Sequence, residues 1–171
     1  MATYQGLDIF VFGGIPGEDV VAEVLQIRRK YVAARVIEVV RPAESRVEPP
    51  CRYYGECTGC QWQHVDYDAQ LAAKLDQVID ALKRIGGFYD TNVLPVLPSP
   101  DQYGYRNHAR FTVGKGGDLG FVNRETRRFI HVDTCMLMHS GINHLLSELQ
   151  DKCGETTQLA IRAGEVTGDY L

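Results

Sequence analysis

The sequence predicts an α+β protein: a small, incomplete OB-like β barrel, followed by a domain that combines an antiparallel sheet with helices. β-Branched stretches dominate the first fifty residues, and two stretches with a helical apolar period lie further along, separated by short strand patterns with glycine turns. With 171 residues, 44% hydrophobic and 23% charged, the chain can bury a core. We expect two domains, residues 1–47 and residues 48–171.

The first domain is predicted as a three-stranded β unit. Its strands are residues 7–12, 19–27 and 31–40. Three strands do not close a five-stranded barrel, so we expect the beginning of the barrel to be missing. The proline-rich residues 41–50 then predict a stiff, extended connector to the first cysteine.

The second domain begins with a cysteine-rich loop and continues into the best helical pattern of the chain. Apolar residues recur at helical spacing from Leu71 to Ile85, Asp66 or Asp68 can cap the start, and Gly86 follows the end. Residues 92–100, with three prolines, predict a linker.

Strands and a second helix are expected after the linker. The predicted strands are residues 105–113, 119–122 and 129–132, and a last hairpin joins 158–163 to 165–171. The helix is predicted over residues 140–152, with Ile142, Leu145, Leu146 and Leu149 facing inward. The glycine-rich residues 114–117 lie between two strands and so fit a hairpin turn rather than a nucleotide-binding loop. The chain stops inside an apolar strand, as a fragment does, so we expect this domain to be incomplete at its C-terminal end.

Four cysteines predict a metal site. Cys51, Cys57 and Cys60 follow one another with five and two intervening residues, and Cys135 lies far downstream. Gly55 and Gly59 permit the positive φ angles that wrap a loop around a metal. Four sulfur ligands leave zinc or an iron-sulfur cluster as occupants. The fifth cysteine, Cys153, is predicted as a small half-buried residue.

The composition also indicates a compartment. The first six residues lack the basic and apolar pattern of a secretory leader, and no segment approaches the roughly 20 apolar residues of a membrane span. We therefore expect a cytoplasmic protein without membrane contact. In that reducing compartment, clustered cysteines favour metal binding over disulfides.

Several segments together resemble the cluster-containing branch of the RNA uracil-5-methyltransferases. The family's cysteine signature is resembled by the run Cys57-Thr58-Gly59-Cys60-Gln61-Trp62-Gln63-His64. The residues that follow it, Tyr67, Gln70 and Leu71, also match the signature. Residues 14–18 and 46–51 resemble the end of the TRAM barrel that precedes it, and residues 105–110 resemble the first strand of the central domain.

The resemblance implies a function and a cofactor. A 4Fe-4S cluster would be bound by Cys51, Cys57, Cys60 and Cys135, and the complete enzyme would methylate RNA, ribosomal rather than transfer RNA, using S-adenosylmethionine. The glycine-rich turn, nucleophilic cysteine and carboxylate base of the family's C-terminal Rossmann domain have no counterpart here. We therefore expect no catalytic residue in this chain, and the chain alone should be inactive.

Basic residues indicate an RNA-contacting surface. The whole chain has a formal charge of -4, yet residues 103–131 hold six basic against two acidic residues, a local excess of +4. The candidates are Arg106, His108, Arg110, Lys115, Arg127 and Arg128. An ordinary solvated strand face would carry the same residue types.

Trp62, Gln63 and His64 are expected to pack near the cluster because they follow Cys60 directly. His64 is also a candidate ligand if the metal is zinc. The alternative function is therefore a stand-alone, zinc-stabilised RNA-binding module without catalytic activity.

Overall fold

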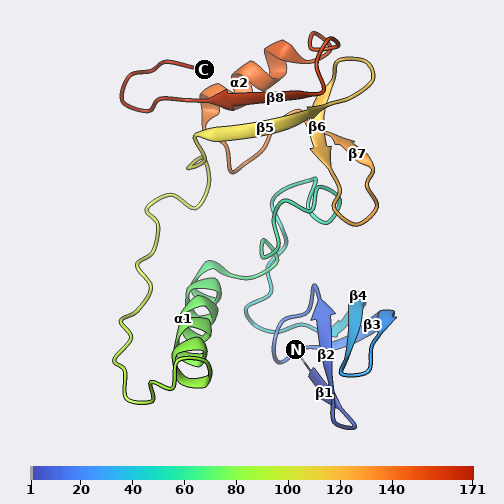
Figure 1. The fold of residues 1–171 in the computed structure, drawn as a ribbon, viewed down its shortest axis with the longest axis vertical. Helices are drawn as coiled ribbons and strands as arrows, with labels where there is room; N and C mark the ends of the chain where they lie inside the picture. Colours follow the sequence, from blue (N-terminus) through green and yellow to red (C-terminus); the bar gives the residue numbers. More distant parts are fainter. Residues whose placement is uncertain (1) are drawn as a thin grey trace. The chain divides into compact units, whose positions relative to one another are not determined.

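The computed structural model describes residues 2–171, which form two compact units (Figure 1). The first unit comprises residues up to 49 together with residues 61–97, and the second comprises residues 50–60 together with residues 98–171. Each unit contains one four-stranded sheet and one helix, so the predicted α+β class is confirmed. The predicted division between residues 47 and 48 stays a prediction.

The first sheet has the strand order β1-β2-β4-β3. Its strands are β1 (Ala2–Tyr4), β2 (Leu7–Phe12), β3 (Asp19–Ile27) and β4 (Tyr31–Arg41). β2 and β4 are parallel, and the other two pairs are antiparallel. The three predicted strands are confirmed. Sequence reasoning missed β1, because three residues are too few to show an alternating pattern.

Helix α1 (Tyr67–Arg84) confirms the first predicted helix. Asp66 is its N-cap: the carboxylate accepts hydrogen bonds from the backbone N–H groups of Asp68 at 3.0 Å and Ala69 at 3.3 Å. After the helix, Gly87 takes a φ of 71°, which glycine adopts at low cost.

The first unit is discontinuous in sequence because the connector pairs with the segment that precedes α1. Arg46 and Val65 form an antiparallel bridge, and the N–H of Val47 donates to the carbonyl of His64 at 3.1 Å. The N–H of Asp66 donates to the carbonyl of Ser45 at 2.8 Å. In the sequence, the cysteine loop (residues 50–60) therefore lies between the two parts of the first unit, although it belongs to the second unit.

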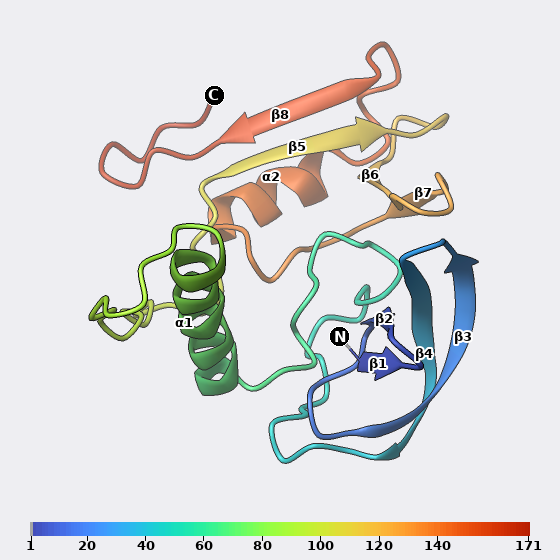
Figure 2. The same cartoon turned by 60° about the horizontal axis from the view of Figure 1, so that its bottom comes forward.

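The second sheet has the order β7-β6-β5-β8 and is antiparallel throughout. Its strands are β5 (His108–Val113), β6 (Leu119–Val122), β7 (Phe129–His131) and β8 (Gln158–Arg162). Helix α2 (Ser140–Leu149) runs beside β5 and β8 (Figure 2). The core between helix and sheet contains Phe111, Leu119, Ile142 and Leu146, all fully buried. The inward orientation predicted for the apolar residues of α2 is confirmed, since Leu145 and Leu149 also pack against this core.

Two predicted boundaries were wrong. β5 begins at His108 rather than residue 105, because the backbone of Arg106 pairs instead with the turn before α2, through the carbonyl of Leu137 and the N–H of His139. α2 ends at Leu149 rather than residue 152, and the next side chain, Gln150, hydrogen-bonds to the backbone of Leu119.

Other sequence expectations agree with the structure in part. The glycine-rich residues 114–117 form the hairpin turn between β5 and β6. The last predicted hairpin was wrong in its second strand: residues 165–171 form no strand, and the Ala163–Tyr170 bridge and backbone hydrogen bonds between Arg162 and Leu171 join them to the end of β8. Neither helix within residues 2–171 is long and apolar enough to cross a membrane.

Candidate metal centre

Three of the predicted ligands lie in a tightly turned loop. The N–H of Tyr54 donates to the carbonyl of Cys51, and the N–H of Cys57 donates to the carbonyl of Tyr53, both at 2.9 Å. Gly55 has a φ of 86°, as predicted. The expectation for Gly59 was wrong, because the second left-handed residue is Thr58, with a φ of 55°.

The loop is fixed to the hairpin of β6 and β7. The side-chain amide of Asn123 donates to the carbonyl of Glu56 at 2.7 Å, and the hydroxyl of Thr58 accepts a hydrogen bond from the N–H of Arg124 at 3.1 Å. Asn123 is 8% exposed, and its side-chain oxygen caps the hairpin turn by accepting from two backbone N–H groups. Sequence reasoning missed this buried asparagine, which joins two segments almost seventy residues apart.

Cys135 is held by helix α2. The side-chain oxygen of Asn143 accepts from the N–H of Cys135 at 2.9 Å, and the amide nitrogen donates to the carbonyl of the same cysteine at 3.0 Å. The cysteine backbone is therefore clamped on both of its polar groups. Asn143 was also missed, although an amide on the inner side of a predicted helix was a signal that could have identified it.

The electrostatics place three of the cysteines near one another. Burial raises the pKa of the Cys57 thiol, and neighbouring Cys135 and Cys51 raise it further. A hydrogen bond from the backbone of Gly59 and the positive charge of Arg106 act in the opposite direction. Arg106, predicted to contact RNA, therefore lies near Cys57.

The donor set suits a soft metal. All five cysteines are half-buried, and none within residues 2–171 forms a disulfide. Thiolates at this exposure are the usual ligands of zinc and iron-sulfur centres. In the same part of the chain, no three His, Cys, Asp or Glu side chains are arranged to hold a single metal ion. The set of four ligands stays a prediction.

His64 lies in the first unit beside the Glu18–Arg46 ion pair. It is 6% exposed, and burial, then the charge of Arg46, lower the pKa of its imidazole. Trp62 and Gln63 belong to the same unit. The carbonyl of Trp62 accepts a hydrogen bond from Gln70, and the side-chain oxygen of Gln63 is buried without a hydrogen-bond partner. Their predicted packing around a cluster stays a prediction.

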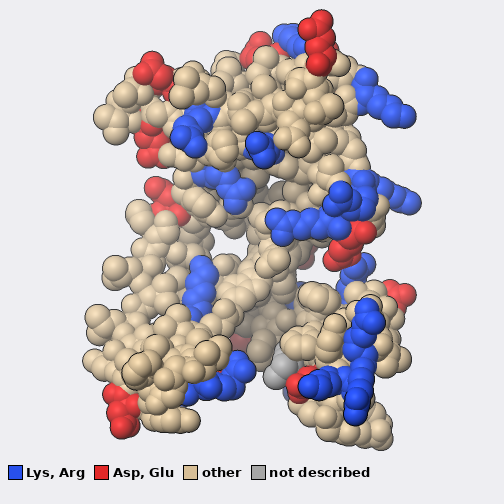
Figure 3. All heavy atoms as spheres, viewed as in Figure 1, with Lys and Arg blue, Asp and Glu red and all other residues tan. Residues whose placement is uncertain are grey.

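The predicted RNA-contacting residues are exposed at several places in the second unit. His108 and Arg110 share the outer face of β5, because Ala109 and Phe111 alternate with them and are buried. Arg162 of β8 lies directly opposite His108 and extends this face, a residue that sequence reasoning missed. Arg106 forms a bridge with Met138 just before β5, Lys115 lies in the turn after β5, and Arg127 and Arg128 precede β7. Basic side chains gather where the β6–β7 hairpin is drawn (Figure 3).

No family model matches the chain. A protein of Synechocystis sp., named an uncharacterized RNA methyltransferase, is 32% identical over 181 residues, which cover 95% of this chain and 39% of the relative. The chain is related to RNA methyltransferases. An RNA methyltransferase of the same description from Chlorobaculum tepidum is 36% identical, over 87% of this chain and 35% of its own length. The chain thus spans about two fifths of the length of these RNA methyltransferases.

A solved structure shares the fold. It is the crystal structure of Pyrococcus abyssi tRNA (uracil-54, C5)-methyltransferase in complex with S-adenosyl-L-homocysteine. The TM-score is 0.67 at 24% sequence identity, and the match covers 95% of this chain and 40% of that one. The fold described above therefore occurs within a larger RNA methyltransferase.

Proposed function

We propose that this chain is the RNA-binding, 4Fe-4S-bearing part of an S-adenosylmethionine-dependent RNA uracil-5-methyltransferase that acts on large-subunit ribosomal RNA. The relationship to RNA methyltransferases over nearly the whole chain supports the general activity. The attachment of the cysteine loop to the segment before Cys135 is the observation that supports the cluster, and the uracil-5 reaction and the ribosomal substrate rest on the resemblance of the cysteine signature. A TRAM-type barrel is the proposed identity of the first sheet.

The metal centre has a structural role in this proposal. Cys51, Cys57 and Cys60 would hold it from the loop, and Cys135 from the turn before α2. A bound 4Fe-4S cluster would supply a covalent link between segments more than seventy residues apart and so reduce the conformational entropy of the chain. The backbone clamp from Asn143 presents Cys135 in one orientation for this purpose.

The outer face of the second sheet is the proposed RNA contact. His108, Arg110 and Arg162 present donors from two adjacent strands, while the opposite face of the sheet is buried against α2. Arginines placed in this way bind phosphates without reading sequence. The choice of uridine would then depend on the remainder of the full-length protein.

The proposed chemistry takes place outside residues 1–171. A thiolate adds to C6 of the target uracil, C5 takes the methyl group from S-adenosylmethionine, and a base removes the C5 proton as the thiolate leaves. The target base must first leave its stacked position in the RNA. The contribution of this chain is to bind and orient the RNA.

The test is the nucleoside product of the full-length protein. Ribosomal and transfer RNA from a strain that lacks the gene would be incubated with the protein and S-adenosylmethionine, digested, and analysed by mass spectrometry. We expect new 5-methyluridine in large-subunit ribosomal RNA. Methylation of transfer RNA alone would overturn the ribosomal assignment, and a different modified nucleoside would overturn the reaction.

A further inference from the structure

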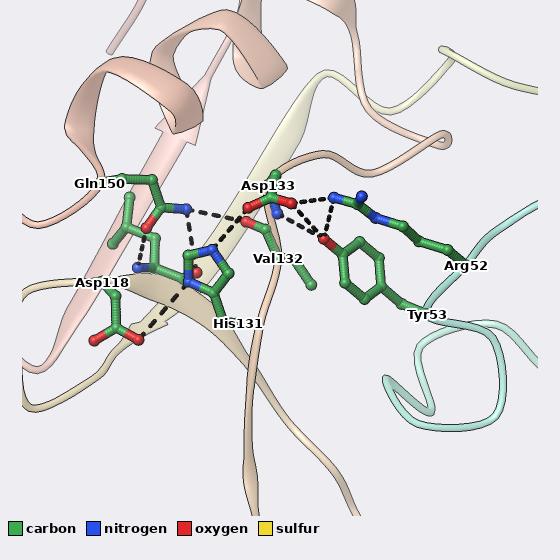
Figure 4. Close-up of polar contacts among 8 residues, drawn as sticks. Arg52, Tyr53, Asp118, His131, Val132, Asp133 and Gln150 are labelled. Atoms are coloured by element: carbon green, nitrogen blue, oxygen red, sulfur yellow. Dashed lines mark hydrogen bonds and ion pairs between the residues drawn. The ribbon is translucent and has the colours of Figure 1, made fainter.

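A polar network joins Arg52 and Tyr53, which follow the first cysteine of the loop, to the segment that leads to Cys135 (Figure 4). Asp133 is its centre: one carboxylate oxygen accepts from Arg52 and from the hydroxyl of Tyr53, at 3.0 Å from the latter. The other oxygen lies 2.7 Å from Nε2 of His131. The N–H of Asp133 donates to the Tyr53 hydroxyl at 3.0 Å, so the tyrosine bonds both the backbone and the side chain of one residue.

The residues of the network lie next to the first and the last of the predicted cysteine ligands in the sequence. Arg52 and Tyr53 directly follow Cys51, and Asp133 lies two residues before Cys135. The contacts span about eighty residues of sequence. They involve no sulfur atom, so they can form whether or not a metal is bound.

Tyr53 is the firmest member of this network. Arg52 and Asp133 are 62% and 57% exposed, and an ion pair at such exposure contributes little to stability. The ring of Tyr53 is instead half-buried and packs against the core of the second unit, and the guanidinium of Arg52 lies 4.8 Å from its centre. The fixed hydroxyl defines the position of the Asp133 backbone.

The far side of the same segment is fixed as well. The side-chain amide of Gln150 donates to the carbonyl of Val132 at 3.0 Å, and its oxygen accepts from the N–H of Leu119 at 2.7 Å. The two residues that follow β7, Val132 and Asp133, therefore have side-chain partners from different elements. The backbone that leads to Cys135 is thus held by hydrogen bonds that do not involve a cysteine sulfur.

We propose that Arg52, Tyr53, His131 and Asp133 form a metal-independent clasp that holds Cys51 beside Cys135, so that the cluster enters a site that is already assembled. These are positioning residues, and the inference rests on the proposed cluster. Without the clasp, the loop would have to find Cys135 during cluster insertion, at the entropic cost of closing a long loop. With it, that cost is met during folding.

The test compares Tyr53→Phe and Asp133→Asn with the unaltered chain in the metal-free state. Asp151→Asn is the matched control, because Asp151 is exposed in the same unit and its φ of 63° suits asparagine. Alkylation of Cys51 and Cys135 by iodoacetamide would be followed by mass spectrometry. We expect both clasp variants to react about fivefold faster or more, the effect of losing one ordinary hydrogen bond, and the control to be unchanged.

Cluster reconstitution provides the second readout. With ferrous iron and sulfide, the clasp variants should gain the absorbance near 400 nm more slowly than the unaltered chain and reach the same final iron content. Unaltered alkylation rates in both variants would overturn the clasp. If the unaltered chain takes up no cluster, the proposed cofactor fails, while the alkylation rates still decide whether the clasp exists.

Discussion

Glu18 and Arg46 form an ion pair that fixes the connector to the first sheet, and the carboxylate side chain is only 1% exposed. Glu18 also accepts hydrogen bonds from the backbone N–H groups of Ile15 at 2.9 Å and Ala43 at 3.3 Å. Arg46 in turn donates to the carbonyl of Gly13 at 2.7 Å. The Glu18 carboxylate thus joins the turn after β2 to the connector.

This ion pair predicts a loss of stability in acid. Hydrogen bonding from Arg46 lowers the pKa of Glu18 from 4.5 to about 2, although burial acts in the opposite direction. Because the folded-state pKa is depressed, the stabilisation is complete above pH 4.5 and is lost as the pH falls towards 2. It amounts to about 3 kcal/mol.

The measurement is urea unfolding between pH 2 and pH 6, followed by fluorescence of Trp62, the single tryptophan, which lies in the first unit. Glu18→Gln should be less stable near neutral pH and lose most of the dependence on pH in this range. Glu48→Gln, at an exposed carboxylate of the connector, should behave like the unaltered chain. Equal pH dependence in all three proteins would contradict the assignment.

Asn143→Ala should loosen the Cys135 turn. The substitution leaves the N–H and carbonyl of Cys135 without their side-chain partner, at a cost of about 1–3 kcal/mol. We expect a lower midpoint of thermal unfolding for the second unit and faster loss of bound metal to a chelator. His144→Ala, at the next and exposed position of α2, is the control. The clamp is refuted if the two variants lose metal at the same rate.

Gly120→Ala should disrupt the second sheet. A Cβ atom at this position would lie 2.1 Å from the carbonyl oxygen of Ile130 and 2.8 Å from the ring of Phe129. Backbone cannot yield as a flexible side chain can, so we expect a loss of about 2 kcal/mol or more in the free energy of unfolding. Gly116→Ala, whose nearest contact would be 3.7 Å away, should be nearly neutral in the same urea titration by circular dichroism.

Replacing Arg110 and Arg162 by glutamine should weaken RNA binding. Each phosphate contact removed should lower the slope of log affinity against log salt by about one. Titration of a ribosomal RNA fragment at several salt concentrations would measure this. Two basic residues of the first unit, Arg41 and Arg84, provide the matched double variant, since each pairs with a carboxylate there. An unchanged salt slope in the sheet variant would exclude this face.

The local elements were largely predictable from the sequence. Short-range periodicity in the sequence predicts the strands at residues 7–12 and 19–27. A helical apolar period and the N-cap residue Asp66 predict helix α1. Neither the parallel pairing of β2 with β4 nor the joining of residues 45–47 to residues 64–66 was predictable, because both depend on contacts between distant segments.

The sequence was sufficient to predict the candidate cysteine ligands, but the asparagines that hold their backbone segments in place were missed. Cysteine spacing identifies Cys51, Cys57 and Cys60 because it is a local pattern. Asn123 and Asn143 support the loop and Cys135 through side-chain hydrogen bonds to backbone. The inward amide of a predicted helix was a signal for Asn143, whereas the partner of Asn123 lies 67 residues away and no local pattern indicates it.

We propose that Cys51, Cys57, Cys60 and Cys135 bind an iron-sulfur cluster in an RNA methyltransferase. The iron, sulfide and zinc content of the chain after anaerobic purification, together with the absorbance near 400 nm, tests the proposed cluster. We predict about four irons per chain for the unaltered protein and for Cys153→Ser, and loss of the cluster on replacing Cys51, Cys57, Cys60 or Cys135 by serine. A colourless protein with stoichiometric zinc would exclude the iron-sulfur cluster.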